Sequence, residues 1–422
     1  MGASISAWSL GAFAYYLVAG RVLGPDAYGL VAALQSVLVV GSVPIIALQW
    51  SAARVIAGSD EHTRAGALAT YRRGIIGATS LALLLGIVAT IVTFAIDTWI
   101  RPVPVVPLVI TYFSLAAIVP LLVACGALQG EHRYVGLAWS YAASGVLRAP
   151  LLLPLLLLPF ADVDATVLAV GLAIAIGAIW AGWLTRDDLK VRTPPPRDMW
   201  RNFTASLPAT MVGLTGIAVL TNVDVIAAKL SIGGEQAGLF GAASVVAKSL
   251  LVVPQALTLV LLPRVARREA RGERTGSLLA AGIITMALAG VLAMLLAVPL
   301  AQPIMRIAFG AAYEQAASLL VPFFGATALL GALLILVNHH VARSDHRFVW
   351  AVGGLAVLQI ILLIFFSTSS EAIIAIDAIV GGVGLIMHEA IYLNTDESIL
   401  RGAGAQFAAV GRRLRHRLGG TT

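Results

Sequence analysis

The stretch "GPDAYGLVAA", Gly24 to Ala33, is a polar turn sequence set between two long apolar runs. A near-copy, "GGEQAGLFGA", occupies Gly233 to Ala242, 209 residues further along the chain. A second pair of polar stretches, "GEHRYV" from Gly130 and "SDHRFV" from Ser344, follows in the same order. Because these matches are polar and ordered, they predict an internal duplication. The offset of 209 pairs Gly24 with Gly233, Asp26 with Glu235, Gly29 with Gly238 and Leu30 with Leu239.

The sequence around both turns is too apolar for a soluble protein. The chain has 422 residues, of which 59% are hydrophobic and 12% charged, and its mean hydropathy is +0.93. Runs such as 74–96 exceed the roughly 20 residues with which an α-helix crosses the hydrocarbon layer. Since lipid cannot satisfy a bare backbone, these runs predict helices, and we expect an all-α integral membrane protein. The expected segments are 5–23, 28–57, 74–96, 105–128, 134–159, 165–185, 204–231, 236–263, 277–299, 315–337, 347–366 and 371–393.

The net charge of +7 is spread along the predicted membrane edges. Of the 28 Lys and Arg residues, only Arg21, Arg101, Lys229 and Arg306 follow odd-numbered segments, whereas most others follow even-numbered segments or lie in the C-terminal tail. The positive-inside rule therefore places both termini in the cytoplasm and both glycine turns outside. This distribution predicts a multi-pass plasma-membrane protein with no nucleic-acid partner. Three lysines against 25 arginines indicate a GC-rich bacterial genome.

The repeat predicts two six-helix bundles that run in the same direction. The expected parts are an N-terminal lobe at 1–185, a basic cytoplasmic linker at 186–203, a C-terminal lobe at 204–393 and a basic cytoplasmic tail at 394–422. Two parallel bundles with a central cavity between them are typical of transporters that work by alternating access. A duplicated bundle that anchors or scaffolds a partner is the alternative.

Four glycines in the repeated turns are expected to form a hinge at the outer mouth, because glycine permits tight turns and close helix approach. They are Gly24, Gly29, Gly233 and Gly238. The tail predicts either a basic amphipathic helix on the inner leaflet, with apolar residues opposite four arginines, or a solvated extension.

The chain resembles the polysaccharide and oligosaccharide-lipid flippases of the multidrug, oligosaccharidyl-lipid and polysaccharide (MOP) exporter superfamily. The resemblance rests on four stretches: "RVLGPDAYGLVAA", "LTNVDVIAAKLSIGGEQAGLFGAASVVAK", "LLPRVAR" and "PIMRIAFGAAYEQAASLL". It implies two lobes around a central cavity and the movement of a lipid-linked saccharide, of the polyprenyl phosphate or pyrophosphate type, from the inner to the outer leaflet. The implied partners are that substrate, membrane lipids and other polysaccharide-assembly proteins.

Two cations lie deep inside predicted segments, one in each lobe. Arg148 lies 14 residues beyond Tyr134, roughly 21 Å along its helix, and Lys248 lies roughly 15 Å below Gly238. Intramembrane charges are functional candidates by default, so we expect Arg148 and Lys248 to hold a phosphate-bearing head group. The alternative is a structural ion pair between Lys248 and Asp224, which lie at similar depths on either side of the second turn. Asp224 is itself a candidate for substrate binding or coupling, and Asn222 is expected to hydrogen-bond beside it as part of the same candidate site.

Other polar residues carry weaker signals. Arg54 and Arg264 end equivalent helices and are expected either to anchor them in the cytoplasmic interface or to gate substrate entry. Asp377 is a candidate site for a coupling proton or sodium ion. His388 and Glu389 are expected at the interface.

No cofactor or metal site is expected. The chain has no P-loop. Adjacent His339 and His340 point to different helix faces, which disfavours a shared metal. Cys125 is the single cysteine and lies in an apolar segment, which excludes an intrachain disulfide.

Four functions are compatible with this pattern. A lipid-linked saccharide flippase is favoured, because the charges within segments include two cations. A multidrug or organic-cation antiporter of the same architecture would be expected to have a cavity dominated by carboxylates. A sugar transporter of the major facilitator fold would carry a charged loop motif that "GSDEHTRAGALATYRR" matches poorly. A polysaccharide polymerase or glycosyltransferase would show a large outward loop or an acidic nucleotide-sugar motif, so the chain is not expected to be an enzyme.

Overall fold

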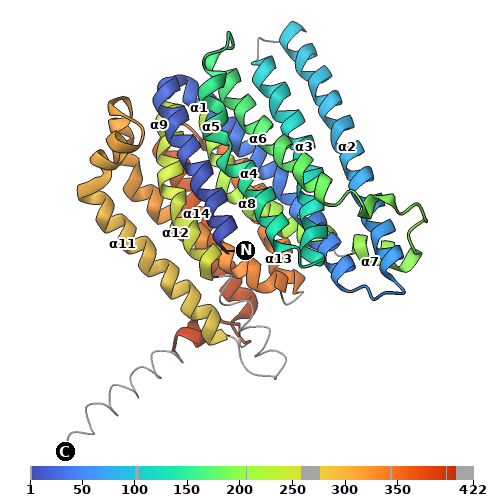
Figure 1. Ribbon diagram of the computed structural model, residues 1–422. Helices are drawn as coiled ribbons and strands as arrows, with labels where there is room; N and C mark the ends of the chain where they lie inside the picture. Colours follow the sequence, from blue (N-terminus) through green and yellow to red (C-terminus); the bar gives the residue numbers. More distant parts are fainter. Residues whose placement is uncertain are drawn as a thin grey trace, which may run out of the picture.

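The computed structural model describes residues 2–99, 104–205, 207–257, 276–342, 345–395 and 397–404, and within these ranges the regular elements are helices, with no strand. The long helices run side by side as one bundle (Figure 1). Their bounds are α1 Gly2–Ala57, α2 Arg64–Trp99, α3 Val105–Gly130, α4 Tyr134–Val146, α5 Arg148–Leu155, α6 Asp162–Leu184, α7 Arg197–Ala205, α8 Leu207–Ser231, α9 Gly234–Lys248, α11 Gly276–Ala308, α12 Ala317–Ala342, α13 His346–Phe366 and α14 Ser370–Tyr392. Short 3₁₀ helices are η1 Asp188–Lys190, η2 Ser249–Leu251 and η3 Ala311–Ala316.

Ten stretches of the described residues are long and apolar enough to cross a membrane. The first of them, Trp8–Ala57, covers most of the first predicted segment and all of the second. The predicted segment 134–159 is divided into α4 and α5 and so falls short of a full span. Each of the twelve predicted segments is largely helical, although 156–159 are not helical and 206 and 258–263 lie outside the described residues. The expectation of an all-α membrane protein is confirmed.

The first two predicted segments meet at Gly24, where α1 breaks. Gly24 has φ 70° and ψ 170°, and Gly233, before α9, has φ 64° and ψ −172°. Both values of φ lie in the left-handed region that glycine tolerates and other residues avoid. The two predicted turns therefore share one backbone conformation. This agreement favours the predicted match of Gly24 with Gly233, although the duplication itself stays a prediction.

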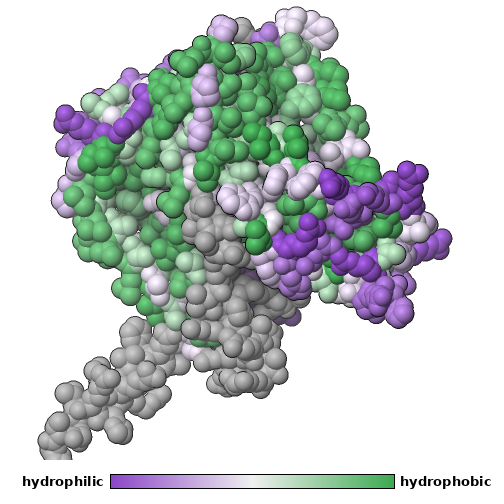
Figure 2. Space-filling view, viewed as in Figure 1, coloured by the Kyte–Doolittle hydropathy of each residue, from purple (hydrophilic) through white to green (hydrophobic). Residues whose placement is uncertain are grey.

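Helices α2 and α11 lie at opposite edges of the bundle (Figure 1) and form much of its apolar outer surface. In the most apolar 18-residue stretch of each helix, only 11% of the residues of α2 and 17% of those of α11 are buried. Figure 2 shows hydrophobic residues over most of the visible face, with hydrophilic residues gathered around α7 and the chain before it. An outer surface of this kind fits contact with lipid.

The N-terminal half, α1–α6, and the C-terminal half, α8–α14, meet mainly through α1, which packs against α8 and α9. We call the end of the bundle that carries Gly24 and Gly233 the knuckle end, and the opposite end, where α7 lies, the basic end. The segment predicted as a linker packs against the N-terminal half at the basic end. Phe203 of α7 is buried against Gly74 of α2, and Arg73 lies 4.6 Å from the ring of Trp200.

A cluster of charged residues contacts the start of the predicted linker, 186–203. Glu131 pairs with Arg64 and with Arg133, the latter at 3.2 Å, and Arg133 lies 4.0 Å from the carboxylate of Asp188. Burial, and secondly the charge of Glu131, raise the pKa of Asp188 to about 6. In the folded protein Asp188 therefore binds its proton more tightly than in the unfolded chain.

This raised pKa predicts how stability depends on pH. Because the native carboxyl has the higher pKa, wild-type stability falls as the pH rises from about 4 through 6. Asp188→Asn removes that loss and should raise the apparent melting temperature by about 1–2 °C at pH 7.5, with no gain at pH 4. The check is thermal unfolding in detergent at both pH values. The control is Asp187→Asn, because Lys190 lowers the pKa of exposed Asp187, and a gain for that variant at pH 7.5 would contradict the assignment.

Candidate functional site

A buried ion pair joins α8 and α9 in the C-terminal half. The ammonium Nζ of Lys248 donates to both carboxylate oxygens of Asp224, at 2.8 and 2.7 Å. Asp224 is completely buried, and the side chain of Lys248 is 14% exposed. The ammonium also lies 5.6 Å from the ring centroid of Phe323 on α12. The spacing around the α8–α9 turn thus brings these two charges together, as the structural alternative predicted.

Two further helices complete this cluster. Gln359 of α13 donates its side-chain N–H to Asp377 Oδ1 of α14 at 2.7 Å and to the carbonyl of Leu220 at 3.1 Å. Asp377 is fully buried and interacts electrostatically with both Asp224 and Lys248. Its Oδ2 has no hydrogen-bond partner among the described residues. We call Asp224, Lys248, Gln359 and Asp377 the charged cluster.

Asn222 does not belong to this cluster. Its side-chain N–H donates to the carbonyl of Ala218 at 3.0 Å and to Thr221 Oγ1 at 2.9 Å, both on its own helix. The predicted hydrogen bond beside Asp224 was therefore wrong. Asn222 lies two residues before Asp224, and side chains two apart on a helix point in different directions.

Arg148 lies in the other half, where the predicted segment 134–159 breaks. Leu147 separates α4 from α5, and Arg148 is the first residue of α5. Its Nε donates to the carbonyl of Ser144 at 2.9 Å, and its guanidinium lies 5.7 Å from the ring of Trp8. Arg148 is only 8% exposed, and within the described ranges no carboxylate lies within 4.0 Å of it. Among the residues that the structure describes, it is a buried cation without an anionic partner.

The two candidate cations therefore differ. Lys248 is neutralised inside its own half by Asp224, whereas Arg148 has only a carbonyl and aromatic neighbours, among them Tyr15 and Tyr16. Burying a charge without a counter-ion is costly. An anion that entered this region would therefore be stabilised by the guanidinium of Arg148.

The two halves are in close contact at the knuckle end. A Cβ atom on Gly29 would lie 2.9 Å from the backbone nitrogen of Gly238, and one on Gly238 would collide with the carbonyl of Pro25. The predicted hinge glycines Gly29 and Gly238 thus touch each other directly, and any side chain at either position would separate the halves.

Aromatic and polar contacts reinforce this closure. The Tyr313 hydroxyl donates to the carbonyl of Gly20 at 2.9 Å, and the ring of Tyr28 packs against those of Phe309 and Tyr313. Lys229 lies 3.8 Å from Asp26 across the same boundary. The knuckle end is therefore closed in this structure, and we call these contacts the knuckle seal.

The remaining predicted site residues are less informative. Arg54 lies exposed in the last turn of α1, whereas Arg264 and the amphipathic stretch of the tail lie outside the described residues. The gate role of both arginines stays a prediction.

Three histidines at the basic end, His339, His340 and His388, are buried inside the protein. His340 and His388 share a hydrogen bond at 3.0 Å between their Nε2 atoms, and His339 lies 2.6 Å from Glu397. No group of three or more His, Cys, Asp or Glu residues in the described part of the chain could hold a metal ion. His388 is completely buried inside the protein near the end of α14, and its expected depth at the membrane boundary stays a prediction.

Comparisons with known proteins place this geometry in a family. The family described as "Polysaccharide biosynthesis protein" matches residues 4–269. No curated protein matches the chain. Among solved structures, the lipid II flippase MurJ in an inward closed conformation is similar with a TM-score of 0.72 and 14% identity, over 95% of this chain and 89% of that one. A multidrug resistance MATE family transporter of the MOP superfamily, inward-facing, has a TM-score of 0.65 and 15% identity, over 90% of this chain and 93% of that one.

Proposed function

Because the chain belongs to the polysaccharide biosynthesis protein family and has the fold of MOP superfamily transporters, we propose that it flips a lipid-linked saccharide intermediate. The saccharide would move from the inner to the outer leaflet of a bacterial plasma membrane by alternating access between the two halves, with both termini in the cytoplasm. The basic end would then open where the knuckle end is closed. Other polysaccharide-assembly proteins would supply and consume the intermediate.

The observation that carries this proposal is the buried Arg148. A phosphate or pyrophosphate group is the anionic part of a lipid-linked saccharide, and guanidinium groups bind phosphate oxygens with charge-assisted hydrogen bonds. The Nε of Arg148 is occupied by Ser144, but its terminal amino groups have no hydrogen-bond partner among the described residues. Arg148 would hold the phosphate while the lipid tail stays in the membrane.

The charged cluster has a different role in this scheme. Since Asp224 already neutralises Lys248, we assign this pair to the architecture of the C-terminal half. Asp377, with one buried oxygen unpartnered, is the group within the cluster to which a coupling proton or cation would bind. Asp377 lies on α14 and interacts electrostatically with Asp224 on α8. An ion that binds to Asp377 would change that interaction and so the position of α14 relative to α8.

Replacing Arg148 tests the proposal. A hydrogen bond to a charged group contributes about 1.5–3 kcal/mol, so Arg148→Ala should slow flipping by about 10- to 100-fold, and Arg148→Lys should retain part of the activity. The assay uses proteoliposomes containing a polyprenyl diphosphate that carries one radiolabelled N-acetylhexosamine. Flipping is measured as access of the sugar to a membrane-impermeant oxidant.

Arg306→Ala is the control, because Arg306 is an exposed cation paired with Glu314 at 3.3 Å. Wild-type flipping by a stably folded Arg148→Ala protein would refute the role of Arg148. If wild-type protein did not flip this lipid at all, the proposed substrate class would be wrong.

A second candidate function is antiport of organic cations, which the two buried carboxylates Asp224 and Asp377 favour. Such a transporter would accumulate tetraphenylphosphonium in the same proteoliposomes when a proton or sodium gradient is imposed. Flipping of the diphosphate lipid without cation uptake would favour the first proposal. The reverse result would favour the second.

A further inference from the structure

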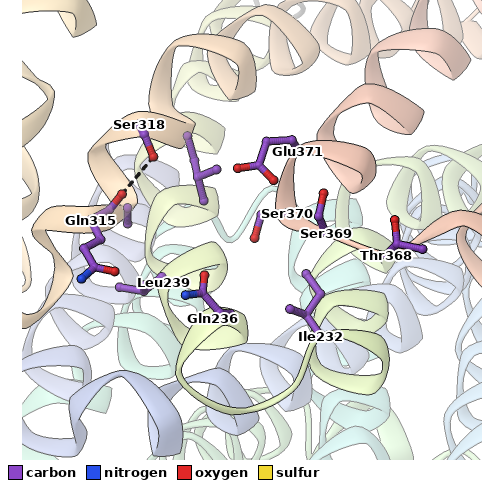
Figure 3. A pocket seen from close by; sticks show the side chains of 11 residues that line it. Ile232, Gln236, Leu239, Gln315, Ser318, Thr368, Ser369, Ser370 and Glu371 are labelled. Carbon is purple, nitrogen blue, oxygen red and sulfur yellow. Dashed lines mark hydrogen bonds between the residues drawn. The ribbon is translucent and has the colours of Figure 1, made fainter.

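A polar pocket of about 380 Å³ opens at the knuckle end of the C-terminal half. It lies where the α8–α9 turn, the start of α12 and the connection from α13 to α14 come together (Figure 3). Every residue that lines it belongs to the C-terminal half, so it is separate from Arg148. Its volume is in the range of sites that bind small molecules.

The lining combines amide, hydroxyl and carboxylate groups with an apolar floor. Gln236 of α9 and Gln315 of η3 contribute amides to the lining, and Glu371 contributes a carboxylate from the start of α14 (Figure 3). None of these three side chains has a hydrogen-bond partner among the described residues. Hydroxyl groups of Ser318, Thr368, Ser369 and Ser370 surround them, and Ile232, Leu239 and Leu319 supply the apolar contacts.

This set of groups fits a neutral, hydroxyl-rich ligand better than an anion. An amide both donates and accepts, and a carboxylate accepts two hydrogen bonds, so together they match the adjacent hydroxyls of a sugar ring. The lining contains no Lys, Arg or His that would bind phosphate. The aliphatic side chains can pack against the C–H face of the same ring.

We propose that this pocket is a second binding site, which holds the uncharged sugar units of the transported head group on the release side of the membrane. This assignment rests on the proposed function for its direction and for its ligand class. Asp224 lies nine residues before Gly233, so the charged cluster is roughly 14 Å deeper in the bundle. The pocket therefore recognises the saccharide at a level well away from the buried charges.

The test measures sugar binding without lipid or phosphate. Wild-type protein in nanodiscs is mixed with a panel of soluble neutral tri- and tetrasaccharides, and saturation-transfer NMR reports which of them bind. We expect binding of at least one of them at millimolar concentration. The double variant Gln236→Ala/Glu371→Ala should weaken that binding by at least tenfold, since it removes the hydrogen bonds of one amide and the charge-assisted hydrogen bonds of one carboxylate.

Two controls separate this site from the rest of the molecule. Glu314→Gln changes a neighbouring carboxylate that does not line the pocket, and it should leave sugar binding unchanged. Arg148→Ala should also leave it unchanged, even though it slows flipping. Because Gln236 and Glu371 are exposed, the double variant should keep the wild-type melting temperature.

Three outcomes would overturn the proposal. They are no binding of any saccharide, binding that survives the double variant, or preferred binding of tetramethylammonium, which would make Glu371 a cation site. The proposed function is tested by a different result, which is flipping in proteoliposomes. Sugar binding in nanodiscs does not depend on flipping, so either proposal can fail while the other holds.

Discussion

Asp224→Leu and Lys248→Met, made singly, should each destabilise the folded protein by about 3–5 kcal/mol, because each leaves the other charge buried without its partner. The double variant should be close to wild type or more stable, since replacement of a buried ion pair by apolar residues of similar volume is often neutral. Lys248→Met should be the more harmful single change. It leaves Asp224 and Asp377, which interact electrostatically, with no cation between them.

The measurement is chemical or thermal unfolding of the four proteins in the same detergent, arranged as a double-mutant cycle. The control is the surface pair Lys229 and Asp26, whose charged atoms lie 3.8 Å apart and whose side chains are 24% and 77% exposed. Its single variants should cost less than about 1 kcal/mol.

The flipping assay then separates architecture from substrate binding. If the pair only supports the fold, the double variant will flip the diphosphate lipid at a rate near that of wild type. If Lys248 holds the phosphate, the double variant will be stable and inactive. That second result would contradict the role we assign to this pair.

The sequence was sufficient for the helical class, and it offered the pairing of Lys248 with Asp224 as one of two alternatives for Lys248. Long apolar runs determine where helices must lie in a membrane. The two charges flank one short turn, so an antiparallel arrangement of α8 and α9 places them at the same depth. Both inferences depend on local spacing, and local spacing is what a sequence shows directly.

Features that depend on packing between distant segments were harder to predict. Gln359 was missed, because an amide in an apolar run carries no charge that would draw attention to it, and its bond to Asp377 joins two helices. The break before Arg148 could have been anticipated, because Pro150 and Pro154 follow closely and proline disrupts a helix interior. Direct contact between Gly29 and Gly238 could not, because contact between distant residues of the two halves is a property of their assembly.

Locking the knuckle seal should abolish transport. A Cβ on Gly241 of α9 would lie 2.9 Å from the Cβ of Ala32 on α1, and disulfides need a Cβ separation of about 3.5–4.5 Å. A shift of less than about 1 Å would therefore allow Ala32→Cys/Gly241→Cys to form a disulfide between the halves. If the knuckle end must open during each cycle, oxidised protein should lose essentially all flipping.

The experiment uses the flipping assay before and after addition of a reductant. Ala32, Gly241 and the native Cys125 are all buried, so the oxidant must be a small molecule that enters the membrane, and the introduced disulfide is identified by whether it joins the two halves. A protease site placed at 192–195, where the chain is not helical, shows on a non-reducing gel whether the halves are covalently joined.

The single variants Ala32→Cys and Gly241→Cys control for the substitutions and should flip in oxidant and reductant alike. Recovery of activity on reduction of the double variant would show that separation of α1 from α9 is required, because the substitutions are the same in both states. Undiminished flipping by a fully cross-linked protein would mean that the saccharide does not leave through the knuckle end, and the alternating-access scheme would have to be abandoned.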